Sequence, residues 1–276
     1  MSAGLSRPAG GRLVAVLLAA ALLVPRPALG QEEGGGRGPL FDSRDAAIAG
    51  AYLAATGVGF ALDRPLATAI RDSALQAYPG LRKTASTFNF LGFAGTFAIS
   101  GGLYGIGRLG GIDEMADAGL HIGEAILIAE AVTGTLKLLV GRARPEVAGE
   151  PYDFGFGRGF RGERYQSFPS GHTTAAFATA AAAAHEIERI WGGNDLLIGL
   201  ATYGPAVLVG VARMFDDRHW ASDVVAGAAI GAFAGWKVVR YSHSGPPTRV
   251  DRWFLSVSMV PGDWGRTRVA LVPVRP

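Results

Sequence analysis

Long stretches of this chain are apolar, almost free of charge and patterned as helices. The two cleanest are residues 196–212 and 221–236, both rich in Gly and Ala. Each approaches the roughly 20 residues that a helix needs to cross the hydrocarbon core of a membrane, and small side chains let helices pack closely in lipid. We therefore expect an all-α, multi-helix bundle over residues 42–245 that is embedded in a membrane.

The first helix is expected to begin at Asp42 or Ser43, because both residue types cap helix starts, and to run to about Thr56. A new helix is then expected to begin at the segment Asp63-Arg64-Pro65, since its proline suits the first turn of a helix. Further along, Pro145 ends a long helical pattern, because proline cannot continue a helix.

One helical pattern, residues 112–143, fits a lipid environment poorly because it carries several charges. Charged side chains at membrane depth are expensive unless they face a polar cavity. A soluble, all-helical periplasmic bundle therefore stays open as the alternative. The polar positions are Asp117, His121, Glu124, Glu130 and Lys137.

The N-terminus follows the order of a secretory signal peptide: Arg7 and Arg12 precede an apolar run that ends in small residues. We interpret residues 1–30 as a signal peptide or an uncleaved N-terminal anchor, and residues 31–41 as a linker. Both interpretations place the chain in the cell envelope. We expect the inner membrane, with the active site facing the periplasm, or alternatively a soluble protein of the periplasm.

Residues 246–276 form a C-terminal tail of different character. The segments Trp253–Val260 and Arg268–Val274 alternate apolar and polar residues, and Pro261-Gly262-Asp263 supplies turn residues between them. This pattern predicts a short β-hairpin, in which we find no catalytic motif.

Composition narrows the chemistry that is open to the chain. A net charge of +3 gives no support to nucleic-acid binding. The chain has no cysteine, which excludes disulfides, a thiol nucleophile and thiolate metal sites.

The first of three motifs is Lys137-Leu-Leu-Val-Gly-Arg-Ala-Arg144-Pro145. The seven-residue spacing of Lys137 and Arg144 predicts two cations, two turns apart, on one helix face. Such a pair suits a phosphate, to which arginine adds bidentate hydrogen bonds. The same residues also fit a basic helix end that interacts with the helix dipole.

The second motif is Ser167-Phe-Pro-Ser170-Gly171-His172-Thr173. Ser170 is a natural N-cap for the Ala-rich helix that follows, and the unpaired N–H groups of a helix start bind anions. Gly171 permits close approach of the backbone, and His172 lies beside whatever binds there. An ordinary capped helix with an incidental histidine is the alternative.

The third motif is Arg213-Met-Phe-Asp-Asp-Arg-His219-Trp-Ala-Ser-Asp223. His219 and Asp223 are four residues apart, which makes them neighbours on one helix face. The carboxylate is expected to accept the Nδ1 proton of His219 and leave Nε2 free to attack, while Arg213 reaches the same anion. A surface His–Asp pair at a helix start is the alternative.

In order and spacing, the three motifs resemble the type 2 phosphatidic acid phosphatase superfamily, which shares its fold with bacterial acid phosphatases and vanadium haloperoxidases. The family pattern is Lys-x6-Arg-Pro, then Pro-Ser-Gly-His, then Ser-Arg-x5-His-x3-Asp. This chain departs from it at Ala212, where the pattern has serine. The resemblance covers residues 124–236 and extends more loosely upstream to residue 42.

The resemblance implies a metal-independent phosphatase that hydrolyses a phosphomonoester or diphosphate through a phosphohistidine. It implies His219 as the nucleophile, Asp223 as its orienting carboxylate, and His172 as the acid that protonates the leaving oxygen and then activates water. We expect no metal and no other cofactor, because cations already face the phosphate oxygens. The residues that would hold the phosphate are Lys137, Arg144, Ser170, Gly171 and Arg213.

The expected substrate is a lipid phosphate or diphosphate in a membrane. Three alternatives stay open: a soluble periplasmic acid phosphatase of broad specificity, a vanadate-dependent haloperoxidase that uses the same oxyanion pocket, and a non-enzymatic lipid-binding or scaffold protein that has kept the pocket. The intact set of motif residues argues against the last. Glu124 and Glu130 are expected to have packing or ion-pair roles, and Arg142 to support the site or face solvent. The histidines that match no motif position are His121, His185 and His243.

Overall fold

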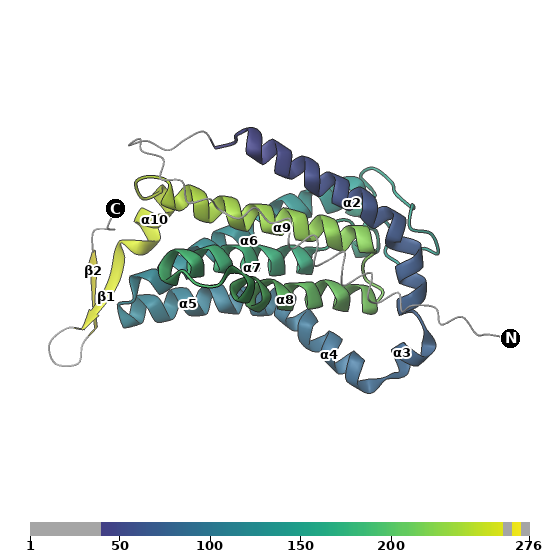
Figure 1. Cartoon of the computed structure of the whole chain (residues 1–276), viewed down its shortest axis with the longest axis horizontal. Coiled ribbons are helices and arrows are strands. Elements are labelled where there is room, and N and C mark those ends of the chain that lie inside the picture. Colours follow the sequence, from purple (N-terminus) through teal and green to yellow (C-terminus); the bar gives the residue numbers. More distant parts are fainter. Residues whose placement is uncertain (1–39, 262–266, 272–276) are drawn as a thin grey trace.

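The computed structural model describes residues 40–261 and 267–271, so the signal peptide or anchor expected at residues 1–30 lies outside the described residues. The described chain forms an elongated bundle of helices, as predicted (Figure 1). Its helices are α2 (Ser43–Ile70), α3 (Ser73–Ala77), α4 (Pro79–Phe90), α5 (Thr96–Gly110), α6 (Asp113–Val140), α7 (Gly171–Trp191), α8 (Asp195–Phe215), α9 (Ala221–His243) and α10 (Arg249–Leu255). A π-helical turn (Leu91–Gly95) joins α4 to α5, and two short 3-10 turns (Arg158–Arg161 and Glu163–Tyr165) lie between α6 and α7.

Helix α2 begins where the sequence predicts, but it continues through the proline at which a new helix was expected. Asp42 Oδ1 accepts a hydrogen bond from Asp45 N at 2.9 Å, and Asp45 Oδ2 accepts one from Asp42 N at 2.8 Å. The helix then runs unbroken through Pro65. Tertiary contacts hold this region, because the buried Asp63 accepts hydrogen bonds from the backbone N and the hydroxyl of Ser222. The predicted break at this proline was therefore wrong.

Helices α7 and α9 lie side by side in the centre of the bundle, and glycines on α9 let them approach closely (Figure 1). Gly227, Gly231 and Gly235 are spaced by four residues and therefore share one face of α9. A Cβ at Gly231 would lie 2.2 Å from the carbonyl oxygen of Thr174, and a Cβ at Gly235 would lie 2.6 Å from that of Ala178. This backbone contact fixes the start of α7 against the start of α9.

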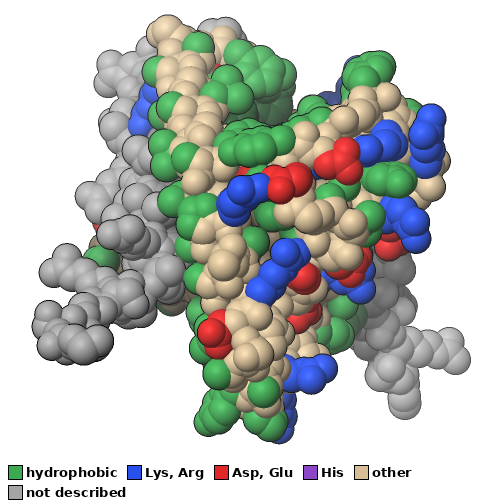
Figure 2. Space-filling model, turned by 90° about the vertical axis from the view of Figure 1, so that its right-hand side faces the viewer, with side chains coloured by type: hydrophobic (Ala, Val, Ile, Leu, Met, Phe, Trp, Pro, Cys, Tyr) green, Lys and Arg blue, Asp and Glu red, His purple; other side chains and the backbone are tan. Residues whose placement is uncertain are grey.

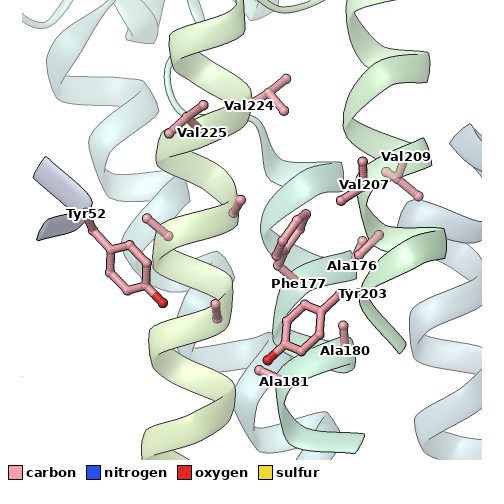
Figure 3. Packing of buried hydrophobic residues seen from close by; sticks show 14 of the residues in the cluster. Tyr52, Ala176, Phe177, Ala180, Ala181, Tyr203, Val207, Val209, Val224 and Val225 are labelled. Carbon is pink, nitrogen blue, oxygen red and sulfur yellow. The ribbon is translucent and has the colours of Figure 1, made fainter. Parts of the chain in front are cut away.

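Apolar side chains from four helices fill the space around α7 (Figure 3). Phe177 of α7 packs against Tyr203 of α8, with ring centroids 6.0 Å apart. Val224 and Val225 of α9 and Tyr52 of α2 belong to the same buried cluster. The core thus ties α2, α8 and α9 to the central α7.

Four helical stretches are long and apolar enough to cross a membrane: Ser43–Ile70, Pro79–Gly110, Asp195–Phe215 and Ala221–His243. The first three bury at most 33% of their apolar window inside the protein. They expose large apolar side chains such as Leu53, Ile106 and Leu200, which lipid accommodates and water does not. The chain is therefore a membrane protein, and the soluble alternative leaves these surfaces unexplained.

The charges of α6, which argued against a lipid environment, do not face outward. None of the five polar positions singled out on this helix is exposed, and His121 is buried. Apolar residues of α6, including Leu127, Ile128 and Val132, are the exposed ones instead. The polar face of α6 therefore points into the bundle, where charged groups can interact with one another.

The described chain ends in two short strands that pair antiparallel, β1 (Val257–Pro261) and β2 (Thr267–Leu271), with Val257 opposite Leu271. The turn expected between them includes residues 262–266, which lie outside the described residues. The strand pair follows α10 at the end of the bundle where α6 begins (Figure 1).

Candidate active site

The three sequence motifs lie at one end of the bundle, where α6 and α8 end and α7 and α9 begin (Figure 1, right). Figure 2 faces this end and shows Lys and Arg side chains mixed with Asp and Glu over part of the surface, beside regions of hydrophobic side chains. The long connection between α6 and α7 also lies here. Residues that are distant in sequence are therefore brought together at this end.

Lys137 lies in the last turn of α6, but Arg144 is not on that helix. The helix ends where Gly141 adopts the left-handed conformation, with a φ of 60°, which glycine reaches without a steric penalty. The prediction that both cations share one helix face was therefore wrong. Arg144 is held in the following loop, where its backbone N donates to Arg164 O at 2.9 Å, while Lys137 Nζ donates to Gln166 O at 2.8 Å.

The three cations expected to bind phosphate nevertheless lie close enough to influence one another, since Lys137 interacts electrostatically with both Arg144 and Arg213. Arg213 is buried and donates from one Nη to Asn89 Oδ1 at 3.1 Å. Within residues 40–261, the buried Nε atoms of Arg144 and Arg213 have no hydrogen-bond partner. Buried donors in proteins are normally paired, so three neighbouring cations with two unused donors fit the binding of an anion.

Ser170 and Gly171 stand at the start of α7, beside these cations. Ser170 occupies the N-cap position, but its hydroxyl pairs with Thr173 Oγ1 at 2.9 Å, and no cap hydrogen bond from its side chain is found. The expected side-chain cap was therefore wrong, and the first N–H groups of α7 are left for another acceptor. A Cβ built on Gly171 would lie 3.6 Å from Lys137 Cε, so this helix start adjoins the lysine.

His219 lies in the loop before α9 and is 4% exposed. Its Nδ1 lies 2.7 Å from Ser167 O but 3.6 Å from Asp223 Oδ2. The Nδ1–H group therefore donates mainly to the backbone carbonyl, and the predicted pairing of His219 with Asp223 is present at ion-pair distance but not as a short hydrogen bond. The tautomer that this contact requires leaves Nε2 without a proton, which is the form that a nucleophilic nitrogen needs.

Asp223 is connected to His219 through Ser167. Ser167 Oγ donates to Asp223 Oδ2 at 2.5 Å, and the backbone N of Trp220 donates to the same oxygen at 2.8 Å. The other oxygen, Oδ1, accepts from the guanidinium of Arg142. Both oxygens are thus engaged by other donors, so Asp223 acts on His219 mainly through Ser167 and by its charge, 3.6 Å from Nδ1.

Two residues that the sequence left in minor roles are part of this site. Arg142 has no exposed surface, and its guanidinium bridges Asp63 and Asp223. Glu130 places its carboxylate 3.3 Å from the position of a Cβ on Gly171. The sequence did contain a sign of the role of Glu130, because its spacing of seven residues from Lys137 puts both on one face of α6. No spacing distinguished Arg142 from a solvated arginine.

His172 lies in the first turn of α7 with its ring stacked on Phe93, at a centroid distance of 5.4 Å. Burial, and after it the neighbouring cations Arg213, Lys137 and Arg144, lower the pKa of His172 to about 4. Burial also lowers the pKa of His219. Both rings are therefore neutral at pH 7 in the free protein. A bound phosphate dianion adds negative charge beside them and shifts each pKa upward.

Residues 118–245 match the family described as the PAP2 superfamily. This match confirms the resemblance that the three motifs predicted. It includes every residue expected at the site: Lys137, Arg144, Ser170, Gly171, His172, Arg213, His219 and Asp223.

Three curated proteins named lipid A 1-phosphatase are similar to parts of the chain. The protein from Porphyromonas gingivalis is 40% identical over 74 residues, which are 27% of this chain and 16% of that protein. Those from Rhizobium johnstonii and Rhizobium etli are each 30% identical, over 115 and 118 residues, covering 42% and 43% of this chain and 44% and 46% of theirs. The chain thus spans less than half the length of each relative.

Two solved structures have folds similar to that of this chain. LpxE of Aquifex aeolicus has a TM-score of 0.49 and 23% identity, with 65% of this chain and 96% of that chain covered. A transmembrane PAP2 type phosphatidylglycerolphosphate phosphatase from Bacillus subtilis has a TM-score of 0.42 and 18% identity, with 83% and 92% covered.

Proposed function

We propose that the PAP2-type site of this chain hydrolyses a phosphate monoester or diphosphate of a membrane lipid through a phosphohistidine on His219. One observation carries the proposal: Lys137, Arg144 and Arg213 come together beside the start of α7, with two buried and unused Nε donors among them. A tetrahedral dianion matches this arrangement in charge and in hydrogen-bond demand.

In the first step, His219 Nε2 attacks the phosphorus atom, so that a P–N bond forms as the P–O bond to the leaving group breaks. The contact of Nδ1–H with Ser167 O orients the ring and stabilises the charge that develops on it. The three cations and the N–H group of Gly171 at the start of α7 stabilise the equatorial oxygens in the transition state, while the N–H of Ser170 is held by the carbonyl oxygen of Asp223. His172, protonated when the dianion binds, donates its proton to the departing oxygen.

The second step returns the site to its starting state. The now neutral His172 accepts a proton from water as the water oxygen attacks the phosphorus atom and the P–N bond breaks. The products are inorganic phosphate and the free His219. Ala212, which replaces the serine of the family pattern, is buried and offers no polar group to either step.

The substrate class is proposed from the surroundings of the site. The membrane-capable stretches are α2, α4–α5, α8 and α9, and the site lies at one end of the bundle that they form. A lipid headgroup can therefore reach the site from the bilayer surface. The curated relatives are named lipid A 1-phosphatase, which makes lipid A the first lipid to test. We further propose that the site faces the periplasm, as the signal-like N-terminus suggests.

Release of inorganic phosphate from defined substrates tests the activity. Purified protein in detergent is incubated with lipid A, phosphatidic acid or the soluble ester p-nitrophenyl phosphate. We expect release from a lipid substrate by wild type and by His185→Gln, and none by His219→Ala. Release confined to the soluble ester would defeat the lipid assignment, and vanadate-dependent bromination in place of hydrolysis would favour a haloperoxidase.

Membrane orientation has a separate test, because the chain has no cysteine. Gly149→Cys places a thiol in the exposed connection at the active-site end, where a Cβ meets nothing within 4 Å. Ser244→Cys places one at the exposed opposite end. We expect a membrane-impermeant maleimide to label the first variant in intact spheroplasts and the second only after lysis; the reverse pattern would place the site in the cytoplasm.

A further inference from the structure

A second cluster of ionisable side chains lies at the end of the bundle opposite the phosphate site. It joins His121 of α6, Glu186 of α7 and His243 at the end of α9, and their ligand atoms all lie within 4.8 Å of one another. Glu186 is 14 residues beyond His172 on the same helix, which separates the two sites by about 20 Å at 1.5 Å per residue. The cluster therefore has no part in the phosphate chemistry.

Two imidazole nitrogens converge on one carboxylate oxygen in this cluster. His121 Nδ1 lies 2.6 Å from Glu186 Oε1, and His243 Nε2 lies 2.9 Å from the same atom. The rings of His121 and His243 are nearly perpendicular, with centroids 4.9 Å apart. Nitrogen and carboxylate oxygen atoms that point at one place form the ligand set that zinc and related divalent metals prefer.

The atoms behind these ligands are arranged as they are around protein-bound metals. The other nitrogen of His121, Nε2, faces Asp251 Oδ1 at 3.4 Å, and the other oxygen of Glu186 accepts from Arg189 at 2.9 Å. Metal-binding histidines typically donate their remaining N–H to a carboxylate, and metal-binding carboxylates are themselves hydrogen-bonded. Asp251 is fixed in turn by Thr248, whose backbone N and hydroxyl pair with it at the start of α10.

The charge of the surrounding side chains is compatible with a bound cation. Asp117 and Glu124 lie within electrostatic reach of His121, so the surrounding carboxylates are those of Asp117, Glu124, Glu186 and Asp251. Among the described residues the permanently charged partner of the cluster is Arg189. Buried carboxylates need compensation, which a protonated His121 supplies in the ion-free protein and which a bound metal ion would supply in place of that proton.

We infer that His121 Nδ1, His243 Nε2 and Glu186 Oε1 bind one divalent transition-metal ion, with Zn²⁺ as the best match to two imidazoles and a carboxylate. Tetrahedral bonds of about 2.0–2.1 Å place ligand atoms about 3.4 Å apart, so the present contacts open by less than about 1 Å on binding. His121 and Glu186 are almost fully buried, whereas the side chain of His243 is 27% exposed. Its edge gives the ion an entry path and leaves a fourth position for water.

The bound ion would join α6, α7 and α9 at the end of the bundle opposite the phosphate site, beyond the glycine contacts between α7 and α9. Through Asp251 it would also hold α10 against the bundle. The role is structural, and it is independent of the proposed phosphatase: His219→Ala should bind the metal like wild type.

Direct titration tests the site. Wild-type protein carrying an affinity tag without histidines is stripped with a chelator and titrated with Zn²⁺ against a chromophoric chelator. We expect one ion per chain, with binding at least 100-fold weaker in His243→Gln, and about 10–100-fold weaker in Asp251→Asn, which alters only the group behind His121. His185→Gln, one residue before Glu186 and outside the ligand set, serves as the matched control and keeps wild-type affinity.

X-ray absorption of the zinc-loaded wild type provides a readout that does not depend on any variant folding. Two imidazoles and one or two oxygens at about 2.0–2.1 Å are expected. Absence of saturable binding by wild type would overturn the inference, as would a His243→Gln variant that binds Zn²⁺ as tightly as wild type. Binding with a different ligand set in the absorption spectrum would overturn it equally.

Discussion

Replacing Arg142 with methionine is expected to destabilise this protein more than removal of any exposed arginine. The guanidinium has no exposed surface and donates to Asp63, Asp223, Ser222 and the carbonyl oxygen of Pro151. Methionine fills much of the same volume but offers no donor. The variant therefore leaves two carboxylates, Asp63 and Asp223, buried without their cation.

Breaking a buried ion pair by removing one partner typically lowers the free energy of unfolding by about 3–5 kcal/mol. For a chain of this size each kcal/mol lowers Tm by about 2–4 °C, so a loss of roughly 6–20 °C is expected. The exposed pair of Arg64 with Glu150 provides the matched control, since both side chains are 66% exposed. Arg64→Met should lower the free energy of unfolding by no more than about 1 kcal/mol.

Thermal unfolding in detergent, followed by circular dichroism, measures both variants. Asp63→Asn combined with Arg142→Met should recover part of the loss, because one of the two stranded carboxylates is then neutral. A fall in kcat is also expected for Arg142→Met, since Asp223 and Ser167 would no longer hold His219 in place. An Arg142→Met variant as stable as Arg64→Met would refute the reasoning.

Further predictions follow from the packing and the charges. Gly231→Val should lower Tm, because the new side chain would collide with the carbonyl oxygen of Thr174. Gly199→Val is the control and should change Tm little, because a Cβ at Gly199 meets no atom within 4 Å. Equal losses of Tm would contradict the close contact of α7 and α9. NMR titration should find the His172 ring neutral down to about pH 5, since its pKa is lowered to about 4, with protonation shifted to higher pH when inorganic phosphate binds; an unshifted titration near pH 6.5 would contradict this. Burial raises the pKa of Glu130 to about 7, so at pH 8, where its carboxyl is mostly ionised, Glu130→Gln should lower the inhibition constant of inorganic phosphate by removing a negative charge beside Gly171. A higher constant would mean that Glu130 assists binding.

The helical bundle and its membrane-capable segments follow from local patterns that a sequence displays directly. Apolar runs of sufficient length predicted α8 and α9, and the spacing of Asp42 and its neighbours predicted the start of α2. Pro65 misled because a proline inside a helix looks like a boundary unless the tertiary contacts of Asp63 are known. Those contacts come from Ser222 and Arg142, which are 159 and 79 positions away.

The motifs located the site, but the partners of individual atoms could not be predicted from spacing. A separation of four residues suggested a bond between His219 and Asp223, yet His219 lies before the helix begins and bonds to Ser167 O instead. Gly141 ended α6 early and moved Arg144 off the helix. Such hydrogen-bond partners depend on where helices end and on which distant residues the fold brings next to a carboxylate.

The central claim is that phosphate becomes bonded to His219 during turnover. Wild type, His172→Ala and His219→Ala are mixed with a labelled substrate that has a good leaving group, and the reaction is stopped in alkaline denaturant, in which a P–N bond survives. We predict that the wild-type protein is labelled and that His219→Ala is not. His172→Ala should carry more label than wild type, because its dephosphorylation is slowed. Label that persists on His219→Ala would contradict the account.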